Sequence, residues 1–253
     1  MRILRSQSGL VLAATLMVST AALAQGNQDP RYRGQQGQQG QQGQQDPRRT
    51  QQDPRYTQQD QQRRIEEERR RQSDYQRVLD QRMAAAQAQQ AQLQTQRRNA
   101  QYAAQQRYLA NLQAQRQQLQ AQRNYNNDPY FSTPPTYRYR VGNTLRETNQ
   151  IGANVLKQAV NYGYDQGVQA GRADRQDRRP SSYRNAFAYQ DANYGYNGQY
   201  VAQSDYNYYF REGFRRGYTD GYGSTSQFGS FNNGTGSILS NVLSGILGLT
   251  NLH

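Results

Sequence analysis

The chain has 253 residues, enough for one or two domains, but only 34% of them are hydrophobic and the mean hydropathy is −1.18. So polar a chain cannot bury enough apolar surface to order its whole length, which excludes a single large core. The absence of cysteine excludes disulfides and thiolate chemistry, and the single histidine, His253, excludes histidine triads and histidine-rich metal sites. We therefore expect neither a metal nor a cofactor. The formal net charge of +13 indicates either an anionic partner or simple solvation of the chain.

Residues 1–24 have the three parts of a bacterial secretory signal peptide. Two arginines supply the positive start, residues 9–18 form the apolar stretch, and a small-x-small cleavage site ends at Ala24, directly before Gln25. The apolar stretch is too short to cross about 30 Å of hydrocarbon at about 1.5 Å per residue, which disfavours an uncleaved anchor. We predict an exported protein, periplasmic or extracellular, with no transmembrane span in the mature chain.

Residues 25–62 are of low complexity and rich in glutamine. A Gly-Gln-Gln triplet occurs four times in residues 34–45, and Asp-Pro-Arg begins at Asp29, Asp46 and Asp53. The short run of triplets contains no proline, which disfavours a collagen triple helix. We predict a disordered tether; a binding role for the Asp-Pro-Arg repeats is the alternative.

Residues 63–124 predict one long helix, because they consist largely of good helix formers and contain neither glycine nor proline. A seven-residue hydrophobic comb runs along them and is interrupted at Gln72 and Arg107. Its members are Ile65, Leu79, Ala86, Leu93 and Ala100. Such a seam gives a weak coiled coil at best, so we predict a largely solvated helix. Residues 125–142, which contain prolines and tyrosines, end the helix and form a linker.

The second half of that helix is basic. From residue 83 to residue 123 it carries five arginines and no acid, with Tyr102 and Tyr108 among them. The arginines are Arg97, Arg98, Arg107, Arg116 and Arg123. Because arginine forms forked contacts with phosphate and carboxylate groups and stacks on rings, they predict binding of a polyanion, such as lipopolysaccharide, acidic polysaccharide or nucleic acid. The alternative is that the charge only solvates the chain.

Two segments fifty residues apart carry glycine at every fourth position, which marks a candidate internal duplication. The first row is Gly163, Gly167 and Gly171, and the second is Gly213, Gly217 and Gly221. Spacing by four places residues on one face only in a helix. Bulky residues beside the glycines form a ridge that includes Tyr164, Phe210, Phe214 and Tyr218. Six interior glycines cost about 6 kcal/mol relative to alanine, so the rows require a partner that packs into them.

We predict a glycine zipper-like helical hairpin in residues 143–223, with helices at residues 144–178 and 204–222. A capping box at residues 144–147 marks the start of the first helix. The partner of each glycine row is the other helix or a second copy, in which case the rows drive self-association. Disorder, a membrane helix and chance spacing are the competing interpretations, and charged residues such as Asp165 argue against a membrane helix.

The motifs of this region resemble those of a set of small exported bacterial proteins of unknown function. The motifs are residues 163–167 (GYDQG), residues 191–196 (DANYGY) and residues 209–218 (YFREGFRRGY). These proteins have a similar order of glycine-and-aromatic helices around a linker, and the resemblance covers residues 150–223. It implies no activity, and the glutamine- and arginine-rich half of the chain departs from the pattern.

The segments after each glycine row complete the predicted module. Residues 181–202 carry six aromatic rings that we expect to cover the hairpin; a stacking platform for sugars or bases is the alternative. After a flexible linker at residues 224–236, residues 237–250 predict an amphipathic helix too short to span a bilayer. We expect it to dock on the hairpin, with self-pairing or contact with a membrane surface as alternatives.

The predicted fold is mainly α with extensive disorder: a long solvated helix and a small C-terminal helical hairpin, with no β-sheet core. The predicted function is that of a non-catalytic structural or interaction protein of the bacterial envelope, partnered by a second copy or another envelope protein, with polyanion binding as the alternative. An enzyme is a third, disfavoured hypothesis, because the sequence has no phosphate loop, nucleophile elbow or metal-ligand cluster. Four carboxylates lie near the glycine rows without a spacing that singles out a pair: Asp165, Asp174, Glu212 and Asp220.

Overall fold

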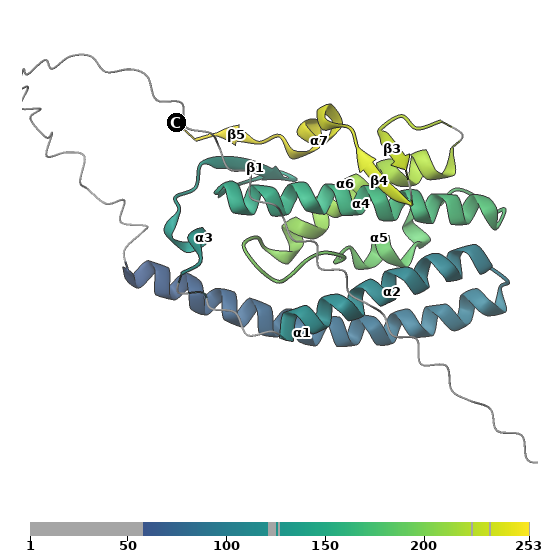
Figure 1. Ribbon diagram of the computed structural model, residues 1–253, viewed down its shortest axis with the longest axis horizontal. Helices are drawn as coiled ribbons and strands as arrows, with labels where there is room; N and C mark the ends of the chain where they lie inside the picture. Colours follow the sequence, from purple (N-terminus) through teal and green to yellow (C-terminus); the bar gives the residue numbers. More distant parts are fainter. Residues whose placement is uncertain (1–57, 121–124, 126, 224, 233, 253) are drawn as a thin grey trace, which may run out of the picture. The chain divides into compact units, whose positions relative to one another are not determined.

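The computed structural model describes residues 58–120, 125, 127–223, 225–232 and 234–252 (Figure 1). All of them fall within one unit that spans residues 50–253. The predicted signal peptide with its cleavage site at Ala24 and Gln25, the tether up to residue 57, and Arg123 lie outside the described residues.

The predicted single helix at residues 63–124 is two helices, α1 (Gln58–Thr95) and α2 (Asn99–Gln120). Arg97 adopts a left-handed backbone conformation (φ 56°), and the Arg98 amide donates to the Leu93 carbonyl at 2.9 Å, which closes the end of α1. The sequence around this break contains no glycine or proline that would predict it. Because the chain reverses here, α2 runs back along α1 (Figure 1), and the Gln105 side-chain amide donates to the Ala86 carbonyl at 2.9 Å.

The prediction that this segment is solvated was also wrong. Tyr75, Leu79 and Ala86 of α1 and Leu112 of α2 are fully buried. The seam is sparse, but small alanine side chains let the two helices approach each other, and the linker between the glycine-row helices covers the rest.

The predicted fold class needs a further correction, because the described residues contain five strands in two small antiparallel sheets. β1 (Tyr137–Val141) pairs with β2 (Thr144–Thr148) around a turn in which Gly142 has a positive φ. The C-terminal β5 (Thr250–Asn251) pairs with the other edge of β1. β3 (Gly229–Asn232) and β4 (Thr235–Ile238) form a separate hairpin. Neither sheet is the core, which lies mainly among the helices.

The first glycine-row helix is α4 (Gln150–Gln176), and it begins later than predicted. Residues 144–147, predicted as a capping box, belong to β2 instead. The cap is Asn149, whose side-chain oxygen accepts from the amides of Ile151 at 3.1 Å and Gly152 at 3.2 Å. The strand prevails at residues 144–147 because β1 offers it a full set of backbone partners.

The second glycine-row helix, α6 (Gln203–Tyr222), lies beside α4 but runs parallel to it, so the predicted helical hairpin was wrong. Gly163 packs on the Phe210 carbonyl and Gly171 on the Tyr218 carbonyl, so residue numbers rise together along both helices. A parallel pair requires a long crossover, and residues 177–202 supply it.

Short elements complete the fold. The crossover contains a 3₁₀ helix (Tyr183–Asn185) and α5 (Phe187–Asp191), which contacts α1, α2, α4 and α6. α3 (Pro129–Ser132) lies against α1. In the predicted C-terminal helix region, α7 (Ser240–Leu247) lies against α4 and α6, and the Tyr209 hydroxyl donates to the Leu247 carbonyl at 3.3 Å.

Candidate functional site

The two glycine rows face each other across the α4–α6 interface. A Cβ built on any of the six glycines would lie 1.9–2.4 Å from a carbonyl oxygen of the other helix, so no side chain fits there. The contacts are reciprocal: Gly163 lies on the Phe210 carbonyl, and Gly213 lies on the Val160 carbonyl. Each residue of α4 in these contacts corresponds to the residue of α6 that is fifty positions later in the sequence. The interface therefore has pseudo-two-fold symmetry about an axis between two parallel helices.

The predicted aromatic ridge is buried beside this interface. Tyr164, Phe210 and Phe214 are inaccessible to solvent, and Tyr218 is nearly so. On α6 the rings of Phe210, Phe214, Tyr218 and Tyr222 follow one another in stacked pairs with centroids 6.1–6.3 Å apart. Ring burial thus accompanies the close backbone contact and offsets the conformational cost of the glycines.

Two of the four carboxylates near the glycine rows accept hydrogen bonds from buried tyrosines. The Tyr164 hydroxyl donates to Asp220 at 2.8 Å, and the Tyr218 hydroxyl donates to Asp174 at 2.6 Å. Burial and the neighbouring carboxylates raise the pKa of both tyrosines, so both hydroxyls stay protonated donors. These carboxylates serve the α4–α6 interface.

The other two carboxylates are engaged elsewhere. Asp165 accepts from the Gly236 amide at 2.6 Å and from the Gln169 side chain at 2.9 Å, and burial raises its pKa. Glu212 pairs with Arg216 at 2.9 Å. The four carboxylates thus lie in separate sets of contacts, and the structure does not bring them together as a pair.

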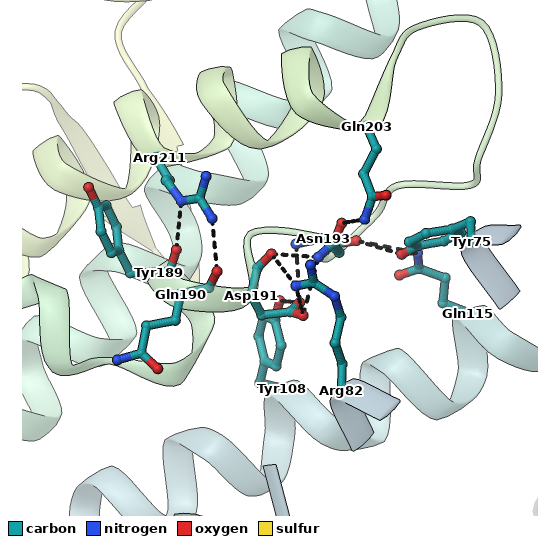
Figure 2. A network of polar contacts seen from close by, with 10 residues as sticks. All are labelled: Tyr75, Arg82, Tyr108, Gln115, Tyr189, Gln190, Asp191, Asn193, Gln203 and Arg211. Carbon is teal, nitrogen blue, oxygen red and sulfur yellow. Dashed lines mark hydrogen bonds and ion pairs between the residues drawn. The ribbon is translucent and has the colours of Figure 1, made fainter. Parts of the chain in front are cut away.

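A polar network centred on Asp191 joins the α1–α2 pair to the crossover (Figure 2). The buried Asp191 carboxylate pairs with Arg82 of α1 at 2.7 Å, and it also accepts from the Tyr108 hydroxyl of α2 and, at 3.1 Å, from the Asn193 amide. The Asn193 side chain in turn accepts from Gln203 of α6 at 2.7 Å. Both oxygens of Asp191 accept hydrogen bonds, and together with Asn193 it connects α1, α2, the crossover and α6.

Sequence reasoning missed two further buried carboxylates, Glu68 and Asp205. Glu68 accepts from the Tyr200 amide at 2.9 Å and pairs with Arg71 at 2.8 Å, and burial raises its pKa. Asp205 accepts from the Tyr139 hydroxyl at 2.8 Å. Both line a cavity of about 370 Å³. Nothing in their sequence spacing links them, because Glu68 of α1 and Asp205 of α6 come to line one cavity only in the folded chain.

The structure does not gather the five predicted arginines into one site. Arg97 is exposed in the turn between α1 and α2, whereas Arg98 pairs with the buried Asp174 at 2.6 Å. Arg107 is exposed on α2, and its guanidinium donates weakly to Gln169 at 3.5 Å. Arg116 lies farther along α2 and pairs with Asp80 at 3.1 Å.

Four more arginines lie at the C-terminal end of α4 and directly after it, beside the start of α2. The Asp177 carboxylate accepts from the amides of Ala100 at 3.0 Å and Gln101 at 2.9 Å, which places the start of α2 beside the end of α4. We call the exposed arginines of this region the arginine cluster: Arg97, Arg107, Arg172, Arg175, Arg178 and Arg179. The run of four arginines in residues 172–179 was the available sequence signal, and the position of α2 could not be read from it.

A cavity of about 430 Å³ opens within the arginine cluster. Arg107 and Arg172 line it together with amide side chains and one ring: Asn99, Gln169, Gln176 and Phe231. The Arg172 guanidinium lies 3.7 Å from the centroid of the Phe231 ring, which orients its fork. The nearby acids are occupied, since Asp174 binds Arg98 and Asp177 caps α2. The arrangement offers charged and neutral hydrogen-bond donors to an anionic group.

No group of three or more histidine, cysteine, aspartate or glutamate side chains among the described residues is placed to hold a metal ion. In the same part of the chain no helix combines the length and apolar character needed to cross a membrane. The chain matches no protein-family model, and searches of curated proteins and of solved structures find no match either.

Proposed function

We propose that this chain is a non-catalytic exported protein of the bacterial envelope that binds polyanions through the arginine cluster. The observation that carries the proposal is a cavity lined by the exposed Arg107 of α2 and Arg172 of α4, whose neighbouring carboxylates are already paired. The other four exposed arginines of the cluster lie on the segments that adjoin it: the turn before α2 and the end of α4. Export rests on the sequence of residues 1–24.

Stabilisation of the α4 helix dipole does not account for the whole cluster. Arginines in the last turn of a helix interact favourably with its C-terminal carbonyls, and Arg175 is such a residue. Arg97 lies just after the C-terminal end of α1, where the helix dipole also favours positive charge. Arg107 lies about two turns inside α2, beyond the reach of the dipole at either end of that helix. The position of Arg107 opposite Arg172 in one cavity therefore favours a bound anion over a purely local role.

The reciprocal glycine contact favours folding over self-association as the use of the glycine rows. Each row is covered by the other helix of the same chain, at distances that admit no second partner. Assembly with a second copy or another envelope protein would therefore use a different surface.

The test is a charge-matched comparison in the full chain. Arg97, Arg178 and Arg179 are exposed, and the variant that changes all three to glutamine removes three positive charges from the cluster. The control changes Arg63, Arg70 and Arg77 of α1, also exposed, to glutamine. Binding of polyphosphate and polygalacturonate is measured over a range of salt concentrations. We expect the cluster variant to lose at least about tenfold in affinity and to show a shallower salt dependence, with the control close to the unchanged chain.

Equal losses in the two variants would mean that net charge alone attracts the ligand, and the proposal would be abandoned. Affinity that does not change with salt would also contradict it. Export has its own measurement: we expect the N-terminus of the protein purified from its native cells to be Gln25.

A further inference from the structure

A further cavity, of about 270 Å³, lies along α2 and α4 beyond the one that opens within the arginine cluster, and it has an uncharged lining. Its lining combines two tyrosines with amide side chains and a glycine, chiefly Tyr162, Tyr194, Gly195, Asn111, Gln118 and Asn197. In contrast with the arginine cluster, this cavity offers rings and neutral hydrogen-bonding groups.

The two cavities follow one another along one face of α2 and one face of α4. On α2 the lining residues include Asn99, Ala103, Arg107, Asn111, Ala114 and Gln118, spaced by three or four. On α4 they include Tyr162, Gln169, Arg172 and Gln176. The weak bond from Arg107 to Gln169 lies between the two ends. At about 1.5 Å per residue the stripe on α2 is about 28 Å long, the length of a short stretch of polymer. We call this stripe the α2–α4 groove.

Backbone geometry holds the Tyr162 ring in place. Gly195 has a φ of +80°, and a Cβ there would lie 2.3 Å from the Tyr162 ring, so only glycine lets the ring occupy this position. Tyr194 meets Tyr162 edge to face, with centroids 5.1 Å apart. The Tyr162 side chain is still partly open to solvent. The ring is therefore both oriented and accessible.

Two of the amide side chains beside the ring are free to bind. Among the described residues, the side chains of Asn111 and Gln118 make no hydrogen bond, and Gln118 is exposed. An amide offers a donor and an acceptor, which matches a sugar hydroxyl, and an aromatic face packs against the C–H face of a sugar ring.

From this juxtaposition we infer that the α2–α4 groove binds an acidic polysaccharide, with anionic groups on the arginine cluster and the C–H face of a sugar ring on Tyr162. The inference rests on the proposed polyanion function and narrows its ligand. A nucleic acid fits less well, because it presents phosphates and flat bases, whereas the side chains beside Tyr162 are neutral amides that match the several hydroxyls of a sugar ring.

The experiment compares Tyr162→Ala with Tyr162→Phe in the full chain, using polygalacturonate, polyphosphate and oligothymidylate as probes. We expect Tyr162→Ala to weaken polygalacturonate binding about tenfold, as for the loss of one ring contact, and to leave polyphosphate binding unchanged. Tyr162→Phe retains the ring and is expected to bind polygalacturonate within about twofold of the unchanged chain. Gln118→Ala, at an exposed position, is a second variant that tests the amide contact without disturbing the ring.

The outcomes separate this inference from the proposed function. If Tyr162→Ala and Gln118→Ala both leave polygalacturonate binding unchanged while the arginine-cluster variant loses it, the inference about the α2–α4 groove is wrong. Polyanion binding by the arginine cluster is then still supported. If Tyr162→Ala weakens oligothymidylate binding and spares polygalacturonate, the occupant is a nucleic acid and the inference is wrong. If the unchanged chain binds none of the three probes, the proposed function itself fails. Circular dichroism confirms that each variant is folded before its binding is interpreted.

Discussion

The molecule contains two helix pairs that reach close contact in different ways. In α4–α6 the helices are parallel and touch backbone to backbone through glycines, with aromatic rings packed beside the contact. In α1–α2 they are antiparallel and meet through alanine, leucine and glutamine. The α4–α6 pair makes a close backbone contact at every fourth residue, whereas the α1–α2 pair has few buried apolar side chains between its helices.

The polar groups show the same difference. Among the described residues, buried amide atoms without a partner include Gln90 Nε2 of α1 and Oε1 of both Gln101 and Gln105 of α2. The tyrosine hydroxyls beside α4–α6 are instead matched with carboxylates. Unpaired buried amides cost stability, so α1–α2 depends more on its attachment to the rest of the molecule through Asp191. One lesson is that a sparse helix pair can be stabilised from outside.

The largest expected effect is loss of the whole fold at alkaline pH. Burial raises the pKa of ten tyrosines above the ordinary value: Tyr75, Tyr108, Tyr130, Tyr139, Tyr164, Tyr194, Tyr196, Tyr206, Tyr209 and Tyr218. A tyrosine with a raised folded-state pKa contributes stability that is fully present below about pH 10, the unfolded value, and is lost as the pH rises further. As the pH rises, we expect tyrosinate absorbance to increase and the helical circular dichroism signal to decrease together, in one step.

Two separate steps would show instead that α1–α2, which carries Tyr75 and Tyr108, opens independently of α4–α6. Complete tyrosine ionisation with unchanged helical signal would contradict the burial of these rings.

Gly217→Ala tests the backbone contact of α4–α6. Its Cβ would lie 1.9 Å from the Tyr164 carbonyl oxygen, so the helices must separate, and we expect the free energy of unfolding to fall by about 3 kcal/mol or more. The comparison in α1–α2 is the reverse change, Ala86→Gly, which removes one buried methyl group and is expected to cost about 1–2 kcal/mol. Chemical denaturation measures both, and a Gly217→Ala loss below that of Ala86→Gly would contradict the close contact.

Arg82→Gln tests whether α1–α2 is stabilised from outside. It leaves the buried Asp191 carboxylate without its ionic partner, and we expect a loss of about 2 kcal/mol. The matched control, Arg116→Gln, breaks an exposed ion pair with Asp80 within the helix pair and should cost less than about 1 kcal/mol. Similar melting temperatures for the two variants would show that the Asp191 network adds nothing beyond a surface pair.

Gly245→Ala has the smallest expected effect, and its sign is opposite. Gly245 lies inside α7, and a Cβ there would meet no atom within 4 Å. Alanine should therefore raise the free energy of unfolding by about 0.5–1 kcal/mol through helix propensity and the unfolded-state entropy. A loss of stability here would mean that glycine is required for a reason other than space.

The sequence by itself determined that two segments form helices and that both need a partner. It placed their ends within two residues, except that α4 begins six residues later than predicted. Glycine at every fourth position has this meaning because side chains repeat on one face only at helical spacing. The glycine spacing does not say whether the partner helix is parallel or antiparallel, because a row of glycines spaced by four is the same in both chain directions. The choice between a hairpin and a parallel pair depends on the crossover at residues 177–202, which carries its own contacts to α1 and α2.

The tertiary structure alone decided the strands, the break at Arg97 and the arginine cluster. Strands of two to five residues are specified by distant partners, as where Tyr137 pairs with Asn251. The break follows from docking of α2 along α1 and onto Asp177, with no local signal from glycine or proline. Arg107 and Arg172 lie on different helices, far apart in the sequence, and only packing brings their charges to one cavity. Local spacing encodes which face of a helix is special, whereas the identity of its neighbour is set by the summed contacts of the folded chain.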